Sequence, residues 1–562
     1  MTPKDPEQGH PDLQGASAQD LRPRRVPARE LGQIAAHLEA AGVEVRTRPG
    51  AEGQAVVTGI SMDSREVQAG DLYVALPGAN AHGAQFSCAA RRAGAAAVLT
   101  DAAGAEILDR QGSPLPLLIV PSVREAVGPL AAWIYGSQPE RGRQRLYAVT
   151  GTNGKTTTTY MIDGLLDRLG ETTGLIGTIE IRAGAEVIPS TLTTPESTHV
   201  HALLSVMRER GITAAAMEVS SHALDYRRVD GVVYDVAGFT NLTQDHLDLH
   251  GSMQAYFDAK AQLFTPARTR RAVIIVDDEW GRRMAEHARR ELGADRVVTL
   301  ATGYGRGAHG EAEADWTVRE VRAEGIGHGF VLQHRDGTRI STGTGLPADF
   351  NVSNAALAAV MVRTGQAEPQ RVAEQLADPE SLTPLVPGRM QVIGQRPLAI
   401  VDFAHNPDAL QRALEAVGLG SDGRVIVVFG ATGERDQLKR PIMGRIAAEH
   451  ADVVIVTDDD PHREPPAPIR GAVAEGARAA AADGARAEAV EDIAPRADAI
   501  RRAVELAGPG DAILVAGRGH ETSQDVDGAD LELDDREELR AALAAHRPAP
   551  TDTPEDPAGE RA

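Results

Sequence analysis

A short run of glycine, lysine and threonine residues offers the clearest chemistry in the sequence. Residues 150–157 read TGTNGKTT; they follow an apolar stretch, Arg145–Val149, and open a helical pattern, Thr156–Leu169. Glycines between a strand and a helix let backbone N–H groups face phosphate oxygens, and the start of the helix adds partial positive charge. Lys155 would reach the β- and γ-phosphates of a nucleotide, and the Thr156 hydroxyl would coordinate Mg²⁺.

Three further side chains could complete such a site. Glu218 ends the predicted strand Thr213–Val219, at the sheet edge where α/β folds bind ligands, and a carboxylate there can hold Mg²⁺. His246 lies in the polar run QDHLD, and Lys260 lies in a predicted helix. Taken alone, Glu218 is an ordinary strand-end acid as often as a ligand. A lone histidine such as His246 is more often structural, and a lone helical lysine such as Lys260 is nearly always solvent-facing.

The elements that would position these residues alternate along the chain. Near-continuous apolar strands are typical of a parallel sheet that is covered on both faces, and helices lie between them. The other predicted strands are Ala272–Val276, Leu398–Val401, Arg424–Phe429, Val453–Thr457 and Ala512–Val515. Predicted helices include Pro407–Val417, Pro441–His450 and Ile469–Ala482. The alternation predicts the α/β class.

Composition shifts divide the chain into predicted domains. A polar stretch at 138–144 and a turn-rich stretch at 381–388 mark the breaks. We expect a disordered tail at 1–27, a smaller N-terminal α/β domain at 28–140, a central domain at 141–384 with a P-loop-type mononucleotide-binding sheet, a C-terminal Rossmann-like domain at 385–546 and a second tail at 547–562.

The composition excludes several functional classes. The chain has 562 residues, and 58 basic against 80 acidic side chains give a net charge of −22. Such a chain is a poor general binder of nucleic acid or of anionic membranes. It has one cysteine, Cys88, no apolar run of about 18–20 residues, and no apolar segment near its start that would read as a signal peptide. We therefore expect a cytoplasmic protein without nucleic-acid or membrane partners.

Further motifs occur in a fixed order across roughly residues 60–540, and together with the loop they resemble the Mur ligase family. These are the ATP-dependent amide-forming enzymes of peptidoglycan precursor synthesis. The matching blocks are EVSSHAL (218–224), TNLTQDHLDLHG (240–251), DAK with LF (258–264), NVSN (351–354), VPGRM (386–390), VDFAHNPDAL (401–410), GERDQLKRPIMG (433–444) and GRGHE (517–521).

A block at 62–75, MDSR with GDLYVA, looks like the uridine-diphosphate-binding domain of the members that add the third and later peptide residues. The block LTTPE (192–196), with VDFAHNPDAL and GRGHE, looks like the members that add the third residue. The resemblance implies that ATP phosphorylates the carboxylate of UDP-N-acetylmuramoyl-L-alanyl-D-glutamate and that a free diamino acid attacks the acyl phosphate. It also implies Mg²⁺ as a cofactor, a monomer, and a role in cell-wall biogenesis, cell shape and cell division. Residues 28–140 would bind the uridine nucleotide, 141–384 ATP, and 385–546 the amino acid.

The resemblance also assigns residue roles by position. Catalysis would involve Lys155, His246 and Lys260, the last carbamylated by CO₂, with Thr156, Glu218 and His246 as magnesium ligands. ATP would contact Gly151, Thr152, Asn153, Gly154, Lys155, Thr156, Thr157, Asn351, Asn354, Arg389, Asp402 and His405. The nucleotide-sugar peptide would contact Ser64, Thr193, Thr194, Ser220 and Arg228, although Tyr226 replaces a polar residue of the family. The amino acid would contact Arg435, Asp459, Asp460, His462, Gly517 and Glu521.

The choice of diamino acid depends on one short motif. Members specific for meso-2,6-diaminopimelate typically show Asp-Asn-Pro-Arg, whose arginine binds the distal carboxylate, whereas residues 459–462 read Asp-Asp-Pro-His. A lost positive charge and an added negative charge favour an acceptor that ends in an ammonium group. We therefore expect L-lysine or L-ornithine. Diaminopimelate remains an alternative because Arg463 could supply the missing contact.

Two other readings remain open at this point. One is a folylpolyglutamate synthase-like ligase, which the N-terminal uridine-type blocks and the GRGHE block argue against. The other is a nucleotide-binding regulator, in which the acid, histidine and lysine set would have no purpose.

Overall fold

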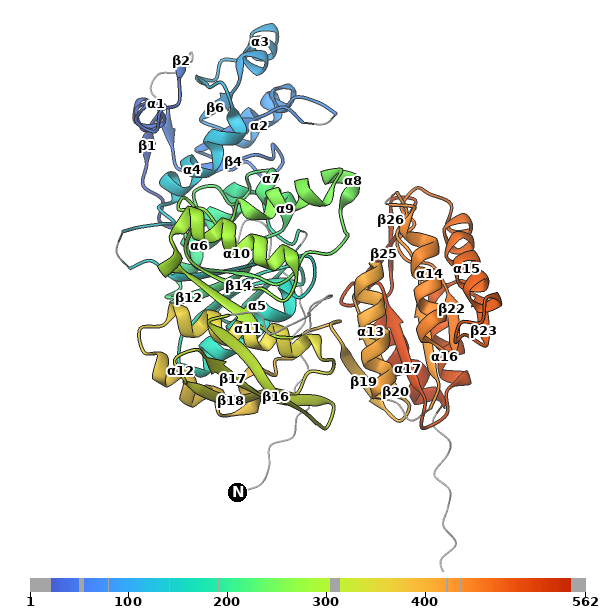
Figure 1. The fold of residues 1–562 in the computed structure, drawn as a ribbon. Helices are drawn as coiled ribbons and strands as arrows, with labels where there is room; N and C mark the ends of the chain where they lie inside the picture. The colour runs from blue at the N-terminus through green and yellow to red at the C-terminus, as the bar shows by residue number, and fades with distance from the viewer. Residues whose placement is uncertain are drawn as a thin grey trace, which may run out of the picture. The chain divides into compact units, whose positions relative to one another are not determined.

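The computed structural model describes residues 22–49, 55–78, 80–140, 142–190, 192–303, 314–420, 423–434 and 436–546. The chain divides into two compact units (Figure 1). The first contains Met1–Gly345 and Phe350–Pro384, and the second contains Leu346–Asp349 and Leu385–Ala562.

The first unit begins with a five-stranded sheet in the order β2-β7-β6-β5-β4, parallel except for β2 (blue in Figure 1). Its strands are β2 (Arg46–Arg48), β4 (Gly59–Ser61), β5 (Asp71–Ala75), β6 (Ala97–Thr100) and β7 (Leu117–Ile119). A separate antiparallel pair is formed by β1 (Arg29–Glu30) and β3 (Val56–Val57). The helices are α1 (Leu31–Ala40), η2 (Gly83–Phe86), α2 (Ser87–Ala93), α3 (Ala102–Arg110) and α4 (Val123–Tyr135). Aliphatic residues such as Ile34, Leu99 and Leu130 fill the core between this sheet and its helices.

The rest of the first unit is built on an eleven-stranded sheet, in the order β11-β10-β9-β12-β8-β13-β14-β15-β16-β17-β18. Neighbours from β9 to β16 run parallel, and both edges are antiparallel. The inner strands are β8 (Arg145–Thr150), β9 (Thr173–Ile176), β12 (Ala214–Glu218), β13 (Tyr234–Phe239), β14 (Thr269–Ile275) and β15 (Val297–Ala301). The outer strands are β10 (Glu180–Ala183), β11 (Glu186–Pro189), β16 (Trp316–Glu324), β17 (Gly327–His334) and β18 (Arg339–Thr344).

Helices connect the strands of this sheet. They are α5 (Lys155–Arg168), α6 (Ser197–Glu209), α7 (Ser221–Asp225), α8 (Leu247–His250), α9 (Met253–Ala261), α10 (Glu279–Leu292), η3 (Ala294–Arg296), α11 (Phe350–Gly365), α12 (Pro369–Leu376) and η4 (Pro379–Leu382). In α9, the Ser252 hydroxyl accepts a hydrogen bond from the Ala255 N–H and so caps the helix start. Tyr256 and Lys260 are four residues apart on this helix, so both face the protein interior.

The order of the central strands brings the glycine loop beside Glu218. Strand β8 lies between β12 and β13, Glu218 pairs with Val149, and Phe239 pairs with Thr150. Because the three strands are parallel, their carboxyl ends share one edge of the sheet. The residues that follow each strand therefore meet at that edge.

The second unit is a six-stranded sheet in the order β19-β20-β24-β21-β22-β23, parallel except for β19 (orange to red in Figure 1). Its strands are β19 (Gln391–Gln395), β20 (Leu398–Asp402), β21 (Val425–Phe429), β22 (Val453–Val456), β23 (Ala489–Asp492) and β24 (Ala512–Ala516). Its helices are α13 (Pro407–Leu419), α14 (Lys439–His450), α15 (Pro466–Ala482), α16 (Arg496–Leu506) and α17 (Asp535–His546). A hairpin of β25 (Ser523–Val526) and β26 (Ala529–Glu532) precedes the last helix.

These sheets confirm the predicted α/β class. The N-terminal tail predicted at 1–27 extends too far. Residues 22–27 belong to the described chain, and the Arg22 guanidinium donates to both carboxylate oxygens of Asp71 at 2.8 and 2.7 Å. The stretch has little apolar material, and polar bonds hold it instead: besides Arg22, the Arg24 and Arg25 N–H groups donate to the Glu209 carboxylate at 2.9 and 2.8 Å. Residues 1–21 and 547–562 lie outside the described residues. Among the helices that the structure describes, none has the length and apolar character needed to cross a membrane.

Candidate active site

The glycine loop is packed so tightly that only glycine fits at two positions. Gly151 and Gly154 have φ angles of +147° and +88°, which L-residues rarely adopt. A Cβ atom on Gly154 would collide with the Asn354 side chain, and one on Gly151 would collide with Thr240. The Asn153 N–H donates to the Asn241 side-chain oxygen at 3.1 Å. The ends of neighbouring elements thus hold the loop in shape at the start of α5.

Two lysines share one backbone oxygen in this loop. The Gly151 carbonyl accepts hydrogen bonds from Lys155 Nζ at 3.1 Å and from Lys260 Nζ at 2.8 Å. Lys260 is only 1% exposed, and its Nζ lies 4.5 Å from the centre of the Tyr256 ring. Burial, and next the positive charge of Lys155, lower the pKa of Lys260 well below its ordinary value. Both effects favour the neutral, nucleophilic form of the amine over the charged form.

Glu218 and Thr156 form an oxygen-rich site at the same sheet edge. The Thr156 hydroxyl donates to Glu218 Oε2 at 2.9 Å, and the Thr178 N–H donates to Glu218 Oε1 at 2.8 Å. The Glu218 side chain is fully buried. Carboxylate and hydroxyl oxygens are ligands that Mg²⁺ accepts, so these residues fit the ion. Sequence reasoning missed Thr178, which holds this carboxylate in place.

His246 was expected at a second Mg²⁺. It precedes α8 with a left-handed φ of +52°, its side chain is 42% exposed, and its Nε2 lies 3.7 Å from Asp245 Oδ2. Its ring packs edge-on against His222, with ring centres 4.8 Å apart. Within the described ranges, no group of three or more His, Cys, Asp or Glu side chains is arranged to hold a metal ion. Its role at a second Mg²⁺ stays a prediction.

The residues expected to contact the peptide are joined to Glu218. The Thr194 hydroxyl donates to the Glu218 backbone carbonyl at 2.8 Å and accepts from the Ser220 N–H at 3.2 Å. Arg228 donates through Nε to Glu196 at 2.8 Å and through Nη1 to the Thr194 carbonyl at 3.3 Å. A ligand at these groups would lie beside the proposed magnesium carboxylate.

Thr193 and the two asparagines also lie in this neighbourhood. The Thr178 hydroxyl lies 3.1 Å from the Thr193 hydroxyl. Asn351 and Asn354, both buried on α11, are joined by a 2.9 Å bond from Asn354 Nδ2 to Asn351 Oδ1. Thr158 on α5 lies 3.4 Å from Asn354. The two amides therefore brace the glycine loop and α5, a role that sequence reasoning did not assign to them.

Ser64 lies elsewhere in the first unit, on the loop between β4 and β5. Ser64 is half-buried, and the hydroxyl of the neighbouring Tyr73 donates to the Gly83 carbonyl at 2.8 Å. Burial raises the pKa of Tyr73 to about 12, so the phenol is neutral at physiological pH.

In the second unit, three of the expected nucleotide contacts gather around Phe403. The Arg389 guanidinium lies 4.1 Å from the centre of the Phe403 ring, and the His405 ring lies 4.6 Å from it. The Met390 N–H donates to Asp402 Oδ2 at 2.7 Å. Burial raises the pKa of Asp402, and the positive charge of Arg389 opposes this shift. The cluster combines one cation, one acid and two rings, a combination suited to a nucleotide.

A second cluster in this unit surrounds the fully buried Arg518. Its guanidinium donates to Asp460 and lies 3.7 Å from Glu521 Oε2. Burial, and next the neighbouring Asp459, raise the pKa of Glu521 to about 8, although Arg518 opposes the shift. The φ angle of Gly517 is +114°, and a Cβ atom there would crowd Asp459 Oδ2, a buried oxygen for which the described residues supply no hydrogen-bond donor. The cluster can therefore receive a positively charged amino group.

Two residues expected in the amino-acid pocket already contact other side chains of the protein. Asp460 accepts from Arg518, and His462 Nδ1 lies 2.8 Å from Asp525 Oδ2. Asp460 therefore does not present an isolated negative charge, which weakens the argument that it repels a distal carboxylate. Arg463 is exposed. Arg435 lies outside the described residues.

Sequence reasoning also missed Arg496, which supports the cluster around Arg518. Arg496 and Asp535 are fully buried and joined by bonds of 2.7 and 2.8 Å. Arg496 also donates to the backbone carbonyls of Asp458 at 3.0 Å and Ala516 at 2.8 Å. It thereby holds together the ends of β22 and β24, where Asp459 and Gly517 follow. No local motif marks a contact between residues so far apart in the sequence.

Comparison with known families gives three matches. Residues 56–135 match the Mur ligase family catalytic domain, 149–362 the Mur ligase middle domain, and 388–519 the Mur ligase glutamate ligase domain. The three matches are in chain order and include most of the clusters described above.

Individual relatives cover nearly the whole chain. A UDP-N-acetylmuramoyl-L-alanyl-D-glutamate–2,6-diaminopimelate ligase of Streptomyces coelicolor is 44% identical over 93% of this chain and 98% of its own. A UDP-N-acetylmuramyl-tripeptide synthetase of Leifsonia xyli subsp. xyli is 42% identical over 94% of this chain and 99% of its own. A solved structure of a UDP-N-acetylmuramoyl-L-alanyl-D-glutamate–2,6-diaminopimelate ligase is 30% identical, with a TM-score of 0.59 over 87% of this chain and 95% of that one.

Proposed function

The chain belongs to the Mur ligase family of ATP-dependent, peptide-bond-forming ligases, and from this premise we propose that it adds a diamino acid to UDP-N-acetylmuramoyl-L-alanyl-D-glutamate in peptidoglycan synthesis. The observation that carries the proposal is the shared sheet edge. The glycine loop with Lys155, the Thr156–Glu218 pair and the buried amine of Lys260 meet there. Of the groups proposed to hold the peptide, Thr194 donates to the Glu218 backbone carbonyl, and Ser220 and Arg228 are bonded to Thr194.

The reaction needs activation because a carboxylate oxygen is a poor leaving group. The dipeptide carboxylate attacks the γ-phosphorus of ATP, and the bond to the β-phosphate oxygen breaks to release ADP. The amine of the incoming amino acid then attacks the acyl carbon, loses a proton and expels phosphate. In such transfers the protein chiefly positions the reactants and stabilises negative charge.

The residues of the first unit have separate tasks in this scheme. The backbone of residues 151–157, with Lys155, would hold the phosphates, and Asn351 and Asn354 would support the nucleotide. Thr156 and Glu218 would hold Mg²⁺, which supplies charge neutralisation for the phosphates when bound. His246 would serve a second Mg²⁺, and Lys260 would carry a carbamate. Thr193, Thr194, Ser220 and Arg228 would hold the peptide, and Ser64 the uridine nucleotide.

The second unit would complete the substrate set. Arg389, Asp402 and His405 would contact ATP, and Arg435, Asp459, Gly517 and Glu521 would contact the amino acid. The proposed assignment is then uridine nucleotide at 28–140, ATP at 141–384 and amino acid at 385–546. We also propose that the protein acts as a monomer in the cytoplasm, where ATP is available, and so contributes to cell shape and division.

For the amino acid we propose 2,6-diaminopimelate. Relatives at 44% and 43% identity are named for that substrate, which weighs against the L-lysine or L-ornithine expected from residues 459–462. The bond from Arg518 to Asp460 supports the revision, because a paired carboxylate repels a second one less strongly. Arg463, exposed and next to His462, is the proposed partner for the distal carboxylate.

The test is phosphate release by the purified protein with ATP, Mg²⁺ and the nucleotide-sugar dipeptide. Diaminopimelate, L-lysine and L-ornithine are assayed in parallel. We expect release to depend on the dipeptide and on an amino acid, and kcat/KM to be highest for diaminopimelate. Arg463→Ala should lower kcat/KM for diaminopimelate about tenfold or more and leave the lysine value unchanged, because one charge-assisted contact is lost. A higher value for lysine or ornithine with the wild type would restore the first expectation.

A further inference from the structure

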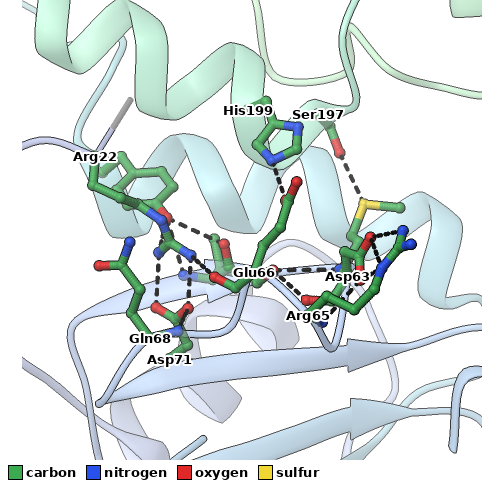
Figure 2. A network of polar contacts seen from close by, with 12 residues as sticks. Arg22, Asp63, Arg65, Glu66, Gln68, Asp71, Ser197 and His199 are labelled. Carbon is green, nitrogen blue, oxygen red and sulfur yellow. Dashed lines mark hydrogen bonds and ion pairs between the residues drawn. The ribbon is translucent and has the colours of Figure 1, made fainter. Parts of the chain in front are cut away.

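The loop that carries Ser64 is held in shape by contacts within the N-terminal part of the first unit. Arg22 donates to Asp71 and, at 3.4 Å, to the Glu66 carbonyl, and Asp71 Oδ2 accepts from the Gln68 N–H at 2.8 Å (Figure 2). Asp63 accepts from the Arg65 N–H at 2.9 Å. These bonds fix the backbone from both ends of the loop. They do not involve the eleven-stranded sheet or its helices.

Side-chain contacts connect this loop to helix α6, and the strongest of them joins His199 to Glu66. His199 Nε2 lies 2.8 Å from Glu66 Oε2, and Figure 2 shows His199 reaching from the helix toward the loop. Beside it, the Ser197 hydroxyl lies 4.0 Å from the Met62 sulfur, a much weaker contact. The His199 and Glu66 side chains are 36% and 34% exposed. Substitution there should therefore leave the fold intact.

The residues just before α6 also contact the proposed peptide site. Thr193 and Thr194 lie just before α6, and Thr194 is bonded to Glu218. Residues 193–199 therefore join the proposed peptide site to the loop of the proposed nucleotide site. The substrate is one covalent molecule with a nucleotide at one end and a peptide at the other, so the distance between the two sites must match its length.

We propose that His199 and Glu66 are positioning residues that set this distance. Their contact aligns the nucleotide-binding loop with the residues that present the carboxylate for phosphorylation. This inference rests on the proposed function, since it takes Ser64 and Thr193–Thr194 as the two ends of one substrate site. Other contacts between the N-terminal part and this segment remain, such as the 2.8 Å bond from Arg124 on α4 to Glu196. Loss of the His199–Glu66 contact therefore loosens the register of the two ends and does not abolish it.

The test compares whole substrate with a fragment. His199→Ala and Glu66→Ala should each raise both Kd and KM for UDP-N-acetylmuramoyl-L-alanyl-D-glutamate about two- to fivefold, the range expected for a partly exposed pair. The Kd for UDP alone should not change, because the bonds that shape the loop remain. KM for ATP and for the amino acid should not change either. Glu66→Gln, which can still hydrogen-bond to the imidazole, should restore most of the affinity, and Glu106→Ala on an exposed face of α3 serves as the matched control.

The outcomes separate this inference from the proposed function. If both alanine variants keep the turnover, Kd and KM of the wild type, the positioning inference is overturned, but the proposed ligase function is not. Weaker binding of UDP alone also overturns it, because that result means the loop itself was deformed. If the wild type binds the nucleotide-sugar dipeptide but does not turn it over, selective weakening in the variants supports the positioning role and rejects the ligase. If the wild type does not bind it, both are rejected.

Discussion

At the scale of single residues, the most informative feature is the Gly151 carbonyl that accepts hydrogen bonds from two lysines. A fully buried second cation beside Lys155 is unfavourable, so Lys260 gives up its proton readily. A neutral amine is the form that adds to CO₂: the nitrogen attacks the carbon, an N–C bond forms and one proton is released. The product is an anion, whose charge would be attracted to Lys155 and to magnesium.

We therefore expect Lys260 to carry a carbamate at neutral pH. With ¹³C-bicarbonate, the wild type should give a protein-bound carbamate signal in the ¹³C spectrum that disappears on acidification. The signal should be absent in Lys260→Ala and retained in Lys439→Ala, which removes a lysine elsewhere. A signal that survives in Lys260→Ala, or no signal in the wild type, would show that Lys260 acts as a plain amine.

Glu521 gives a second residue-scale prediction, through pH. Its pKa near 8 means that the carboxyl group is neutral below that pH and charged above it. If it receives the ammonium group of the incoming amino acid, kcat/KM for the amino acid should rise as the pH passes through 8. In Glu521→Gln this rise in kcat/KM near pH 8 should be absent. Only the pH dependence caused by ionisation of the amino acid itself should remain. Parallel pH profiles for the two proteins would refute the contact.

The raised pKa of Glu521 also affects the stability of the fold. The unfolded chain loses the Glu521 proton near the ordinary value of 4.5, whereas the folded chain keeps it to about 8. In this window the folded state binds more protons, so the contribution of this group to the free energy of unfolding falls as the pH rises. Glu521→Gln should flatten that part of the profile, as measured by urea unfolding at a series of pH values.

At the scale of elements, the junction between β8 and α5 makes a sharp prediction. Gly154→Ala forces an L-residue to a φ of +88° and drives its Cβ toward Asn354. We expect a loss of about 1–3 kcal/mol in the free energy of unfolding and at least a tenfold rise in KM for ATP. Gly164→Ala, in the interior of the same helix with open space around it, should stabilise by about 0.5–1 kcal/mol and leave KM for ATP unchanged. Thermal unfolding and ATP kinetics of both variants check this pair.

Elements with continuous apolar runs were predictable, and elements without them were not. Strands β8, β12, β21 and β24 were expected within two residues of their observed limits, because a strand buried on both faces must be apolar throughout. The antiparallel edges of the eleven-stranded sheet carry many polar residues, such as those of β16, and they gave no comparable signal. Their place in the sheet depends on pairing with distant strands.

The candidate sites show the same limit. The loop and Glu218 could be proposed from the residues, because the loop is a short motif with a chemical rationale and Glu218 ends a neighbouring strand. Lys260 was proposed from the family resemblance. The bonds from Arg518 to Asp460 and from Arg496 to the ends of β22 and β24 join residues far apart in the chain, so no local pattern revealed them. The sequence argument from Asp460 has the same limit: residue type gives a charge, but the partner, here Arg518, decides how strongly that charge acts.

At the scale of the whole molecule, the chain is acidic, and the positive charges proposed to bind substrates lie at a few local positions. A net charge of −22 does not favour anionic substrates in general. In the proposed function, phosphate and carboxylate recognition would therefore rely on local groups such as Lys155, Arg228 and Arg389. Sites for three substrates are proposed along one chain, from Ser64 to Glu521. A ligase with such distributed sites should hydrolyse little ATP until all three substrates are present.

The central claim, ATP-dependent ligation through an acyl phosphate, is tested most directly by following oxygen. The dipeptide carboxylate that accepts the amino acid is labelled with ¹⁸O at both oxygens, and the purified protein is supplied with ATP, Mg²⁺ and diaminopimelate. If the carboxylate attacks ATP and the amine then displaces phosphate, each released phosphate carries one ¹⁸O and the new amide retains the other. Unlabelled phosphate, released in step with peptide product, would show that the carboxylate never became bonded to phosphorus and would contradict the account.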